Sequence, residues 1–286
     1  MVGLRWFVII MALFASVLAE AKVIIYQPLN DDRVLSSMQW HQVMVELKQQ
    51  GYHSIALQWS QHEQSDFIDE QGNALLQQLF NQAAEHGLQV IVGLYHENSF
   101  YQRIKQQPVA LHYYLARLAK KHQQVAIQWQ PFTSKSNFAG WYISDEIDDL
   151  HWQNYAQQQE LVAYLRTIEQ QLKQLAPTKP IYMSSFYAGH SYAEQYLYLL
   201  TQIRQHTNIQ LLWQDGQGTK VLSDTQRQAV QALICQDHED IAVIAELFNN
   251  PAPLRQGGAS ECRNQWAFSL RYLLPHYFPP ASNTVL

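Results

Sequence analysis

The sequence predicts an α/β protein, a single-domain (β/α)8 TIM barrel that follows an N-terminal signal peptide. Short apolar runs alternate along the chain with longer amphipathic stretches. The runs are continuously apolar, which is typical of parallel strands that are buried on both faces. Successive runs start roughly 25 to 51 residues apart, enough for a strand and its crossover helix. Eight such units in about 265 residues match a TIM barrel.

Each element is bounded by residues that end strands or helices. Pro28 ends the first strand, Gly51 and Gly87 end the first two helices, and Pro177 ends the fourth. The strands are expected at residues 23–27, 55–59, 88–95, 139–144, 180–186, 209–214, 241–247 and 266–270. The helices are expected at residues 36–50, 73–86, 108–123, 152–175, 191–206 and 223–235.

The final helix is expected to be short or missing, because the chain ends in a proline-rich stretch, 275–286. The main rival to the barrel is a doubly wound open sheet. That fold usually carries a G-x-G-x-x-G sequence after its first strand, and the sequence has none there.

The first 21 residues have the layout of a secretory signal peptide. Arg5 precedes an apolar run over residues 6–19, and Ala19-Glu20-Ala21 offers small residues at a cleavage site. The run is shorter than the ~20 residues of a membrane span. We therefore expect residues 1–21 to be removed, residues 22–286 to form the barrel domain, and the protein to be periplasmic or secreted. The alternative is an uncleaved membrane anchor.

An oxidising compartment would permit a disulfide. The chain has two cysteines, Cys235 and Cys262, near predicted loops. One bridge between them and two separate buried thiols are both open interpretations. The cysteines and histidines do not have the spacing of a structural zinc site.

The composition limits the classes of ligand. The net charge is -5 and the pI about 6.2, which argues against nucleic acid as a partner. A mean hydropathy of -0.28 excludes a polytopic membrane protein. Charged residues are 15% of the chain, below the usual ~25%, whereas there are 16 tyrosines and 8 tryptophans. This surplus suits a hydroxyl-rich ligand such as a polysaccharide or oligosaccharide.

Polar and aromatic residues follow almost every expected strand. In a TIM barrel the active site lies at the carboxyl ends of the strands, so these residues are the candidates for substrate binding. Among the 12 histidines His96 is the best placed, and His122 is expected on a helix surface. The candidate substrate-binding residues are Tyr26, Gln27, Gln58, Trp59, Tyr95, His96, Tyr142, Asp145, Tyr187, Trp213, Gln214 and Asp215.

Two glutamates stand out at strand ends as candidate catalytic residues. Glu146 follows the fourth expected strand and Glu246 the seventh. Glycoside hydrolysis requires one protonated carboxyl group to release the leaving oxygen and one ionised carboxylate to attack or to activate water. A shared, partly buried site would separate their pKa values. Alternatively, each acid could cap a helix or form an ion pair, and Asp215 is a third candidate.

The positions of these acids resemble a large superfamily of retaining glycosidases, with an acid/base Glu after strand four and a nucleophile Glu after strand seven. That resemblance implies that Glu146 is the acid/base and Glu246 the nucleophile. Asp145 stands where the superfamily commonly has Asn.

A second set of motifs covers most of the chain after the signal peptide. These motifs are Tyr26-Gln27-Pro28, Leu57-Gln58-Trp59, Gly140-Trp141-Tyr142-Ile143, Glu146-Ile147-Asp148, Trp213-Gln214-Asp215-Gly216 with Gly218, and Glu246-Leu247-Phe248. In this order they closely resemble the family named domain of unknown function 4434. That resemblance implies a glycoside-hydrolase-type TIM barrel and a carbohydrate ligand.

Two other chemistries have weaker signals. Gly189-His190-Ser191-Tyr192-Ala193 imitates the nucleophile elbow of serine hydrolases, although Ser191 is more simply interpreted as a helix cap. Asp145, Glu146, Asp148 and Asp149 cluster without the spacing of a known cation-binding loop. Flavin and nicotinamide signatures are absent, so we expect neither cofactor nor metal.

These observations lead to the hypothesis of an exported glycoside hydrolase that acts on a polysaccharide, with retention. The first alternative is a non-catalytic polysaccharide-binding protein in polysaccharide assembly or export. The second is a serine hydrolase that uses Ser191 with a later Asp237 and His276. The oligomeric state is left open.

Overall fold

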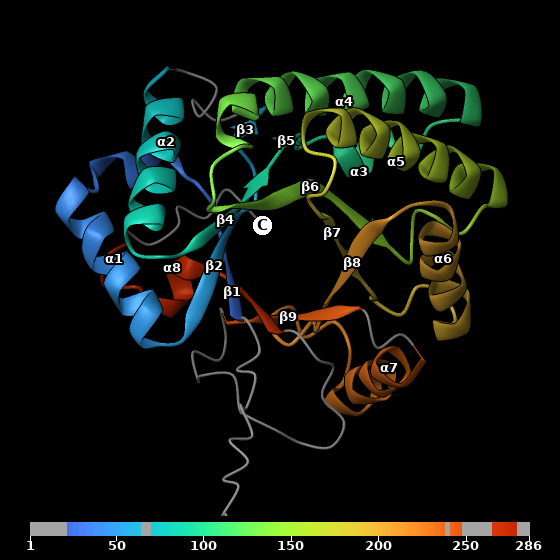
Figure 1. Ribbon diagram of the computed structural model, residues 1–286. Helices are drawn as coiled ribbons and strands as arrows, with labels where there is room; N and C mark the ends of the chain where they lie inside the picture. Colours follow the sequence, from blue (N-terminus) through green and yellow to red (C-terminus); the bar gives the residue numbers. More distant parts are fainter. Residues whose placement is uncertain (1–21, 64–69, 238–240, 248–264, 279–286) are drawn as a thin grey trace, which may run out of the picture.

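The computed structural model describes residues 22–63, 70–237, 241–247 and 265–278. Eight parallel strands close into a barrel in the order β1-β10-β9-β8-β7-β6-β4-β2, which confirms the predicted fold class (Figure 1). The barrel strands are β1 Lys22–Tyr26, β2 Tyr52–Leu57, β4 Gln89–Gly93, β6 Phe138–Asp148, β7 Ile181–Phe186, β8 Ile209–Gln214, β9 Ala242–Glu246 and β10 Gln265–Phe268.

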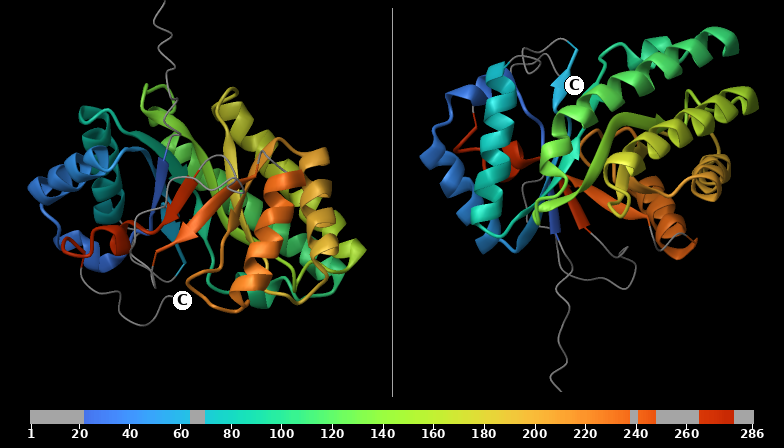
Figure 2. Two further views of the ribbon diagram at one scale, coloured as in Figure 1. Left: turned by 90° about the horizontal axis from the view of Figure 1, so that it is seen from below. Right: turned by 45° about the horizontal axis from the view of Figure 1, so that its top comes forward.

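Helices surround the barrel on its outer side, as Figure 2 shows from two further directions. The last of them, α8, is a single turn, as expected from the proline-rich end of the chain. The helices are α1 Ser37–Gln49, α2 Glu70–Glu85, α3 Phe100–Arg103, α4 Pro108–Trp129, α5 Tyr155–Leu175, α6 Ala193–His206, α7 Asp224–Asp237 and α8 Leu270–Leu273, with 3-10 turns η1 Asn30–Val34 and η3 Gln130–Phe132.

One helix and one strand continue well past the ends that the sequence predicts. Helix α4 continues to Trp129 because Val125, Ala126 and Trp129 are buried there, beyond a polar Lys-Lys-His-Gln-Gln stretch that hides the periodicity. Strand β6 continues past residue 144 to Asp148. The structure also has a second, two-stranded sheet of β3 Gln61–His62 and β5 Tyr95–His96.

The apolar core has two layers because neighbouring residues of a strand face opposite sides. An outer layer lies between strands and helices, and an inner layer fills the barrel. The inner layer comprises Val23, Ile25, Ala56, Ile91, Tyr142, Leu212, Ala242, Ile244 and Trp266. The strands are therefore buried on both faces, as their continuously apolar sequences predict.

An ion pair joins the segments that follow the first and the last barrel strands. Arg271 of α8 donates to both carboxylate oxygens of Asp32 in η1, at 2.6 and 2.8 Å, and both side chains are buried. The Tyr26 hydroxyl donates to the same carboxylate at 2.9 Å. These contacts fix the chain after β10 to the chain after β1, at the seam where the barrel closes.

Several predictions concern residues outside the described parts of the chain. Residues 1–21 lie there, so the signal peptide stays a prediction. Cys235 is disulfide-bonded, and its expected partner, Cys262, lies outside the described residues. Across the described ranges, the helices are too short or too polar to cross a membrane.

Strands β2 and β4 approach each other closely at Gly93, the last residue of β4. A Cβ atom here would lie 2.2 Å from the Leu57 carbonyl oxygen and 2.5 Å from the Gln58 carbonyl carbon, both in the backbone. Gly93→Ala should therefore lower the free energy of unfolding by about 2–3 kcal/mol, as overpacking does. Urea unfolding measures this loss.

The matched control is Gly87→Ala. A Cβ there meets nothing within 4 Å, but φ is +65°, so the loss should be only about 1–2 kcal/mol, from backbone strain. A Gly93→Ala protein as stable as the unmodified protein would contradict the close approach of β2 and β4.

Candidate active site

A cavity of about 490 Å³ lies at the carboxyl ends of the barrel strands. This is where TIM-barrel enzymes place their active sites. Most of the residues that the sequence singled out line it. They are Gln27, Gln58, Trp59, His96, Tyr142, Asp145, Glu146, Gln214 and Glu246.

Tyr26 and Trp213 were expected at this mouth but are not part of the cavity lining. Each precedes a residue that does line it, Gln27 and Gln214. Consecutive side chains of a strand point to opposite faces, so only one of each pair can face inward. Tyr26 packs instead in the outer core, edge-on to Trp40 at 5.2 Å. Trp213 is likewise buried in the outer core.

Tyr95 and Tyr187 also lie outside the lining. The Tyr95 ring packs toward helix α4, with the Lys121 ammonium 5.7 Å from its centre. The Tyr187 hydroxyl donates to the Ser191 carbonyl oxygen at 2.6 Å and so closes the loop after β7. Tyr95 is buried in the outer core and Tyr187 packs against that core, so neither ring faces the cavity.

Asp215 supports the site from behind. Its Oδ1 accepts the backbone N–H of Gln217 at 3.0 Å and that of Glu246 at 3.2 Å. Burial raises the pKa of Asp215, and these two N–H groups oppose the shift. Asp215 therefore fixes the turn after β8 to the end of β9 without lining the cavity.

Glu146 lies in a local irregularity of β6. Between Ile143 and Ile147, strand β6 advances four residues while β7 advances two, from Met183 to Ser185. Such bulges re-aim side chains and are frequent next to active sites. Ser144, Asp145 and Glu146 occupy this bulge, and all three line the cavity.

The Glu146 carboxyl group is held by three donors from other elements. Gln214 Nε2 donates to Oε1 at 2.8 Å, the Tyr101 hydroxyl to Oε2 at 3.2 Å, and Ser184 Oγ to Oε1 at 3.4 Å. Burial raises the pKa of Glu146, and these three hydrogen bonds oppose the shift. The group is therefore oriented, and its protonated form is favoured by the low-dielectric surroundings.

Glu246 at the end of β9 is held by backbone donors. Its Oε2 accepts the N–H groups of Gly218 at 2.7 Å and Thr219 at 3.2 Å, from the loop after β8. Burial raises the pKa of Glu246 from 4.5 to about 7, and the nearby negative charges of Asp215 and Glu146 add to the rise. Two carboxyl groups from opposite parts of the chain thus share one cavity and influence each other's charge.

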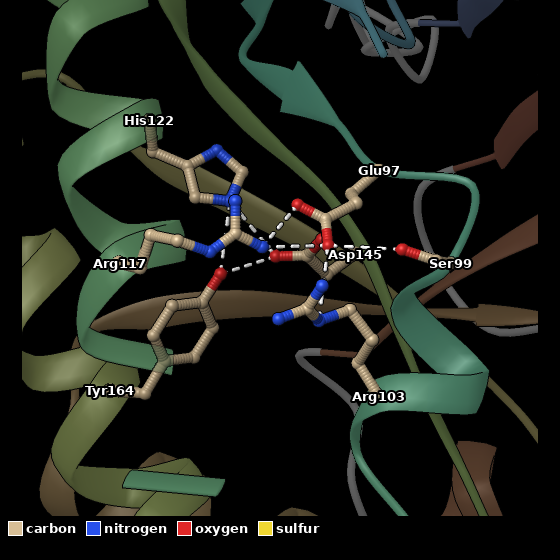
Figure 3. Close-up of polar contacts among 7 residues, drawn as sticks. All are labelled: Glu97, Ser99, Arg103, Arg117, His122, Asp145 and Tyr164. Atoms are coloured by element: carbon tan, nitrogen blue, oxygen red, sulfur yellow. Dashed lines mark hydrogen bonds and ion pairs between the residues drawn. The ribbon is translucent and has the colours of Figure 1, made fainter. Parts of the chain in front are cut away.

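Asp145 turns toward the helices. Its Oδ2 accepts from His122 Nε2 of α4 at 2.9 Å and from the Tyr164 hydroxyl of α5 (Figure 3). The backbone N–H of Tyr95 donates to the other ring nitrogen of His122, at 3.3 Å. His122 was expected on the surface and is fully buried, because α4 and α5 pack over it.

Glu97 is a further residue of the site and directly follows the candidates Tyr95 and His96 in the sequence. Its carboxylate lines the cavity and is buried. Arg117 Nη2 donates to both oxygens at 2.8 and 2.7 Å, Ser99 Oγ donates at 3.1 Å, and Arg103 Nε lies 3.7 Å away (Figure 3). These cations balance the charge of Glu97.

Other lining residues were missed altogether. Asn98, Phe100 and Tyr101 come from a short loop and the one-turn helix α3, which has no periodicity to detect. Thr219 comes from the loop after β8, and Phe268 ends β10. The aromatic pair Phe100-Tyr101 before α4 is the sequence feature that could have indicated this part of the cavity lining.

The acidic cluster of β6 does not converge on one point. Asp148 accepts from the His151 backbone at 2.7 Å, and Asp149 accepts from the Ala188 and Ser191 backbones at 2.8 and 2.9 Å. Asp145 and Glu146 have the separate partners given above. Within the described ranges, His, Cys, Asp and Glu side chains do not gather in threes as a metal site requires.

The serine-hydrolase interpretation does not fit the placement of its residues. Ser191 Oγ donates to the Tyr192 carbonyl oxygen at 3.3 Å, and Tyr192, not Ser191, is the N-cap of α6. His276 lies 3.4 Å from Glu46 of α1, at another part of the barrel. Ser191 lines a separate cavity of about 370 Å³ between α5 and α6.

Comparison with known proteins places the chain in a family. The model of the domain of unknown function DUF4434 matches residues 23–256, so the chain belongs to that family, as its motifs predict. It is 34% identical over 223 residues to the uncharacterized protein YbcH of Escherichia coli strain K12, which covers 78% of this chain and 74% of YbcH.

Solved structures share the fold at low identity. A proposed alpha-L-fucosidase from Bacteroides thetaiotaomicron VPI-5482 has a TM-score of 0.61 and 14% identity, over 82% of this chain and 76% of that one. The β-amylase catalytic domain from Paenibacillus polymyxa has a TM-score of 0.56 and 9% identity, over 91% and 95%. An exo-β-1,4-mannosidase from Opitutaceae bacterium strain TAV5 has a TM-score of 0.56 and 12% identity, over 87% of this chain and 52% of that one. The barrel is therefore of the kind found in glycoside hydrolases.

The raised pKa of Glu246 has a consequence for stability. The folded protein keeps a proton on Glu246 between pH 4.5 and about 7, where the unfolded chain releases it. The free energy of unfolding therefore falls as the pH rises through this range. Glu246→Gln removes this contribution, so its stability relative to the unmodified protein should increase by about 3 kcal/mol from pH 4.5 to 7.

Urea unfolding of both proteins at several pH values measures this difference. Glu194→Gln, at the start of α6 outside the cavity that Glu146 and Glu246 share, is the control and should show no such trend. A constant difference between Glu246→Gln and the unmodified protein across the range would show that Glu246 ionises normally.

Proposed function

We propose that the protein is a glycoside hydrolase that cleaves O-glycosyl bonds of a polysaccharide with retention of configuration. The observation that carries the proposal is the pair of Glu146 and Glu246. One carboxyl group is half-buried and the other buried, burial raises both pKa values, and the two residues lie in the fourth and seventh barrel strands and line one cavity. Two carboxyl groups in different environments are what this reaction needs.

In this mechanism Glu146 is the general acid. Burial favours its protonated form, and Gln214 and Tyr101 hold its two oxygens in place. It would give its proton to the glycosidic oxygen as the bond to the anomeric carbon breaks. Once ionised, it would take a proton from the water that completes the reaction.

Glu246 is the nucleophile. Its ionised form attacks the anomeric carbon and forms a covalent glycosyl-enzyme, which water then hydrolyses at that carbon. The N–H groups of Gly218 and Thr219 stabilise the carboxylate and fix its direction. Since the pKa of Glu246 is about 7, the rate should rise as the pH increases toward that value and Glu246 ionises.

The rest of the cavity suits sugar rings. Trp59, Tyr101, Tyr142 and Phe268 supply aromatic surface beside the carboxyl groups. Gln27 and Asn98 supply amide groups of the kind that bind hydroxyls. A cavity lined by aromatic and amide side chains supports a polysaccharide or oligosaccharide as the ligand.

Substitution of the two glutamates tests the reaction. Glu146→Gln and Glu246→Gln should each lower hydrolysis by at least about 10³-fold on a substrate identified by a polysaccharide screen, because each removes a proton donor or a nucleophile. With Glu246→Ala, azide should restore turnover and give a glycosyl azide. Product analysis measures both effects.

The matched control is Asp224→Asn, which removes one negative charge from a side chain that is 87% exposed on α7. It should retain full activity. Full activity in both glutamine variants would contradict the assignment, as would activity that falls equally in the control.

A non-catalytic polysaccharide-binding protein is the second candidate. The pKa of about 7 at Glu246 favours it, because a protonated carboxyl group cannot attack the anomeric carbon. The same screen separates the two: glycan binding without new reducing ends, at pH 8 as well as at pH 6, would indicate binding without turnover.

We also propose that the protein is exported to the periplasm or beyond, because residues 1–21 have the layout of a signal peptide. N-terminal sequencing of the mature protein, isolated from an expressing bacterium, should begin at Lys22. A mature protein that begins at Met1 or Val2 would contradict cleavage.

A further inference from the structure

One wall of the cavity has buried polar atoms that lack hydrogen-bond partners. They are Gln58 Oε1, His96 Nδ1, Ser144 Oγ and Asp145 Oδ1. All four side chains line the cavity, and they follow or belong to the neighbouring strands β2, β4 and β6. Gln58, Ser144 and Asp145 are 8%, 1% and 2% exposed. We call these four residues the acceptor wall.

Such atoms are costly when they stay unpaired. A buried acceptor without a donor costs about 1–3 kcal/mol, and native proteins keep few of them. Unpaired groups on one wall of a cavity are therefore suited to a ligand that supplies the missing donors.

Asp145 is the centre of this wall. Its Oδ2 accepts hydrogen bonds from His122 Nε2 and the Tyr164 hydroxyl. Its Oδ1 has no hydrogen-bond partner. His122 accepts the Tyr95 N–H at Nδ1, so in this arrangement it carries a proton on Nε2 alone and is neutral. The negative charge of Asp145 is therefore not balanced by His122.

His96 is an acceptor in the same wall. It is hydrogen-bonded to the Ser144 backbone, and its Nδ1 has no partner. Burial lowers the pKa of His96, which favours the neutral ring. A neutral ring that donates from one nitrogen accepts at the other.

Two arginines that lie beside the cavity bind Glu97. Arg117 and Arg103 contact Glu97. Within the described part of the chain, the cavity lining holds neither lysine nor arginine. An anionic sugar would therefore meet carboxylates without a counter-charge, whereas a cationic group would meet the charge of Asp145.

The number of donors separates a hydroxyl from an amine. Gln58 Oε1, His96 Nδ1 and Asp145 Oδ1 can accept but not donate, and Ser144 Oγ can do either. A sugar hydroxyl has one hydrogen to donate, whereas a protonated amine has three and carries a positive charge. A charged donor to a carboxylate also makes a stronger hydrogen bond than a neutral one.

We propose that the acceptor wall binds the ammonium group of an amino sugar, so that the ligand is a glycan with free amino groups. The substrate class rests on the proposed hydrolase function, but the recognition of the ammonium group does not.

Monosaccharides test this recognition without any glycosidic bond to cleave. Glucose, N-acetylglucosamine and glucosamine differ at C2 alone, and galactose with galactosamine and mannose with mannosamine repeat the comparison in other ring configurations. The dissociation constants are measured by NMR titration at pH 6. At least one amine should bind about tenfold or more tightly than its parent sugar, and the N-acetyl sugar should lose this advantage.

Variants locate the effect. Asp145→Asn keeps the shape of the side chain and removes its charge, so the advantage of the amine should fall to within about twofold. Asp224→Asn removes an exposed charge outside the cavity and should keep the full advantage. Gln58→Met removes one acceptor without touching the Asp145 contacts, and should reduce the advantage severalfold even if Asp145→Asn fails to fold.

Three results would overturn the inference: equal binding of amines and parent sugars, an undiminished advantage in a folded Asp145→Asn protein, or methylammonium that binds as tightly as the amino sugars. Its failure is separable from that of the proposed function. If the protein prefers amines but hydrolyses no glycan, ammonium recognition is supported and the proposed hydrolase function is contradicted. If it hydrolyses a neutral glycan but does not prefer amines, the hydrolase function is supported and ammonium recognition is contradicted.

Discussion

The pleat of the strands in a closed barrel is the constraint on which the rest of the structure depends. Because the barrel is closed, one set of alternate side chains must fill its interior and the other must pack against helices. Along β1, Ile25 faces inward and Gln27 continues that face into the cavity, while Ile24 and Tyr26 belong to the outer core. The same alternation separates the packing residue Trp213 from the site residue Gln214.

The acidic groups of the site are held by hydrogen-bond donors from several parts of the chain. The bulge in β6 brings Ser144, Asp145 and Glu146 to the cavity in three successive positions. Glu146 depends on donors from α3, β7 and β8, and Glu246 depends on the loop after β8. Burial raises the pKa values of Glu146 and Glu246. A raised pKa allows a carboxyl group to transfer protons closer to neutral pH.

Much of the fold and part of the site could be predicted from the sequence. Continuously apolar strands at crossover spacing predict a barrel, and its strand ends predict where the acids lie, as with Glu146 and Glu246. The contributions of α3 and the full length of α4 could not be predicted, because neither has a clear periodicity. The partnership of Asp145 with His122 and Tyr164 was also hidden, since it joins three elements whose relative positions no local pattern encodes.

The sequence by itself determined the alternation of strands and helices, the family, and the residue types that gather at the strand ends. These depend on local hydrophobic patterning, which acts over a few residues. Only the tertiary structure decided which of two neighbouring polar or aromatic residues enters the cavity. It also decided how the carboxylates are paired: Arg117 binds both oxygens of Glu97, whereas His122 and Tyr164 bind a single oxygen of Asp145. Those outcomes depend on the parity of each strand in the closed barrel and on contacts between residues far apart in the chain.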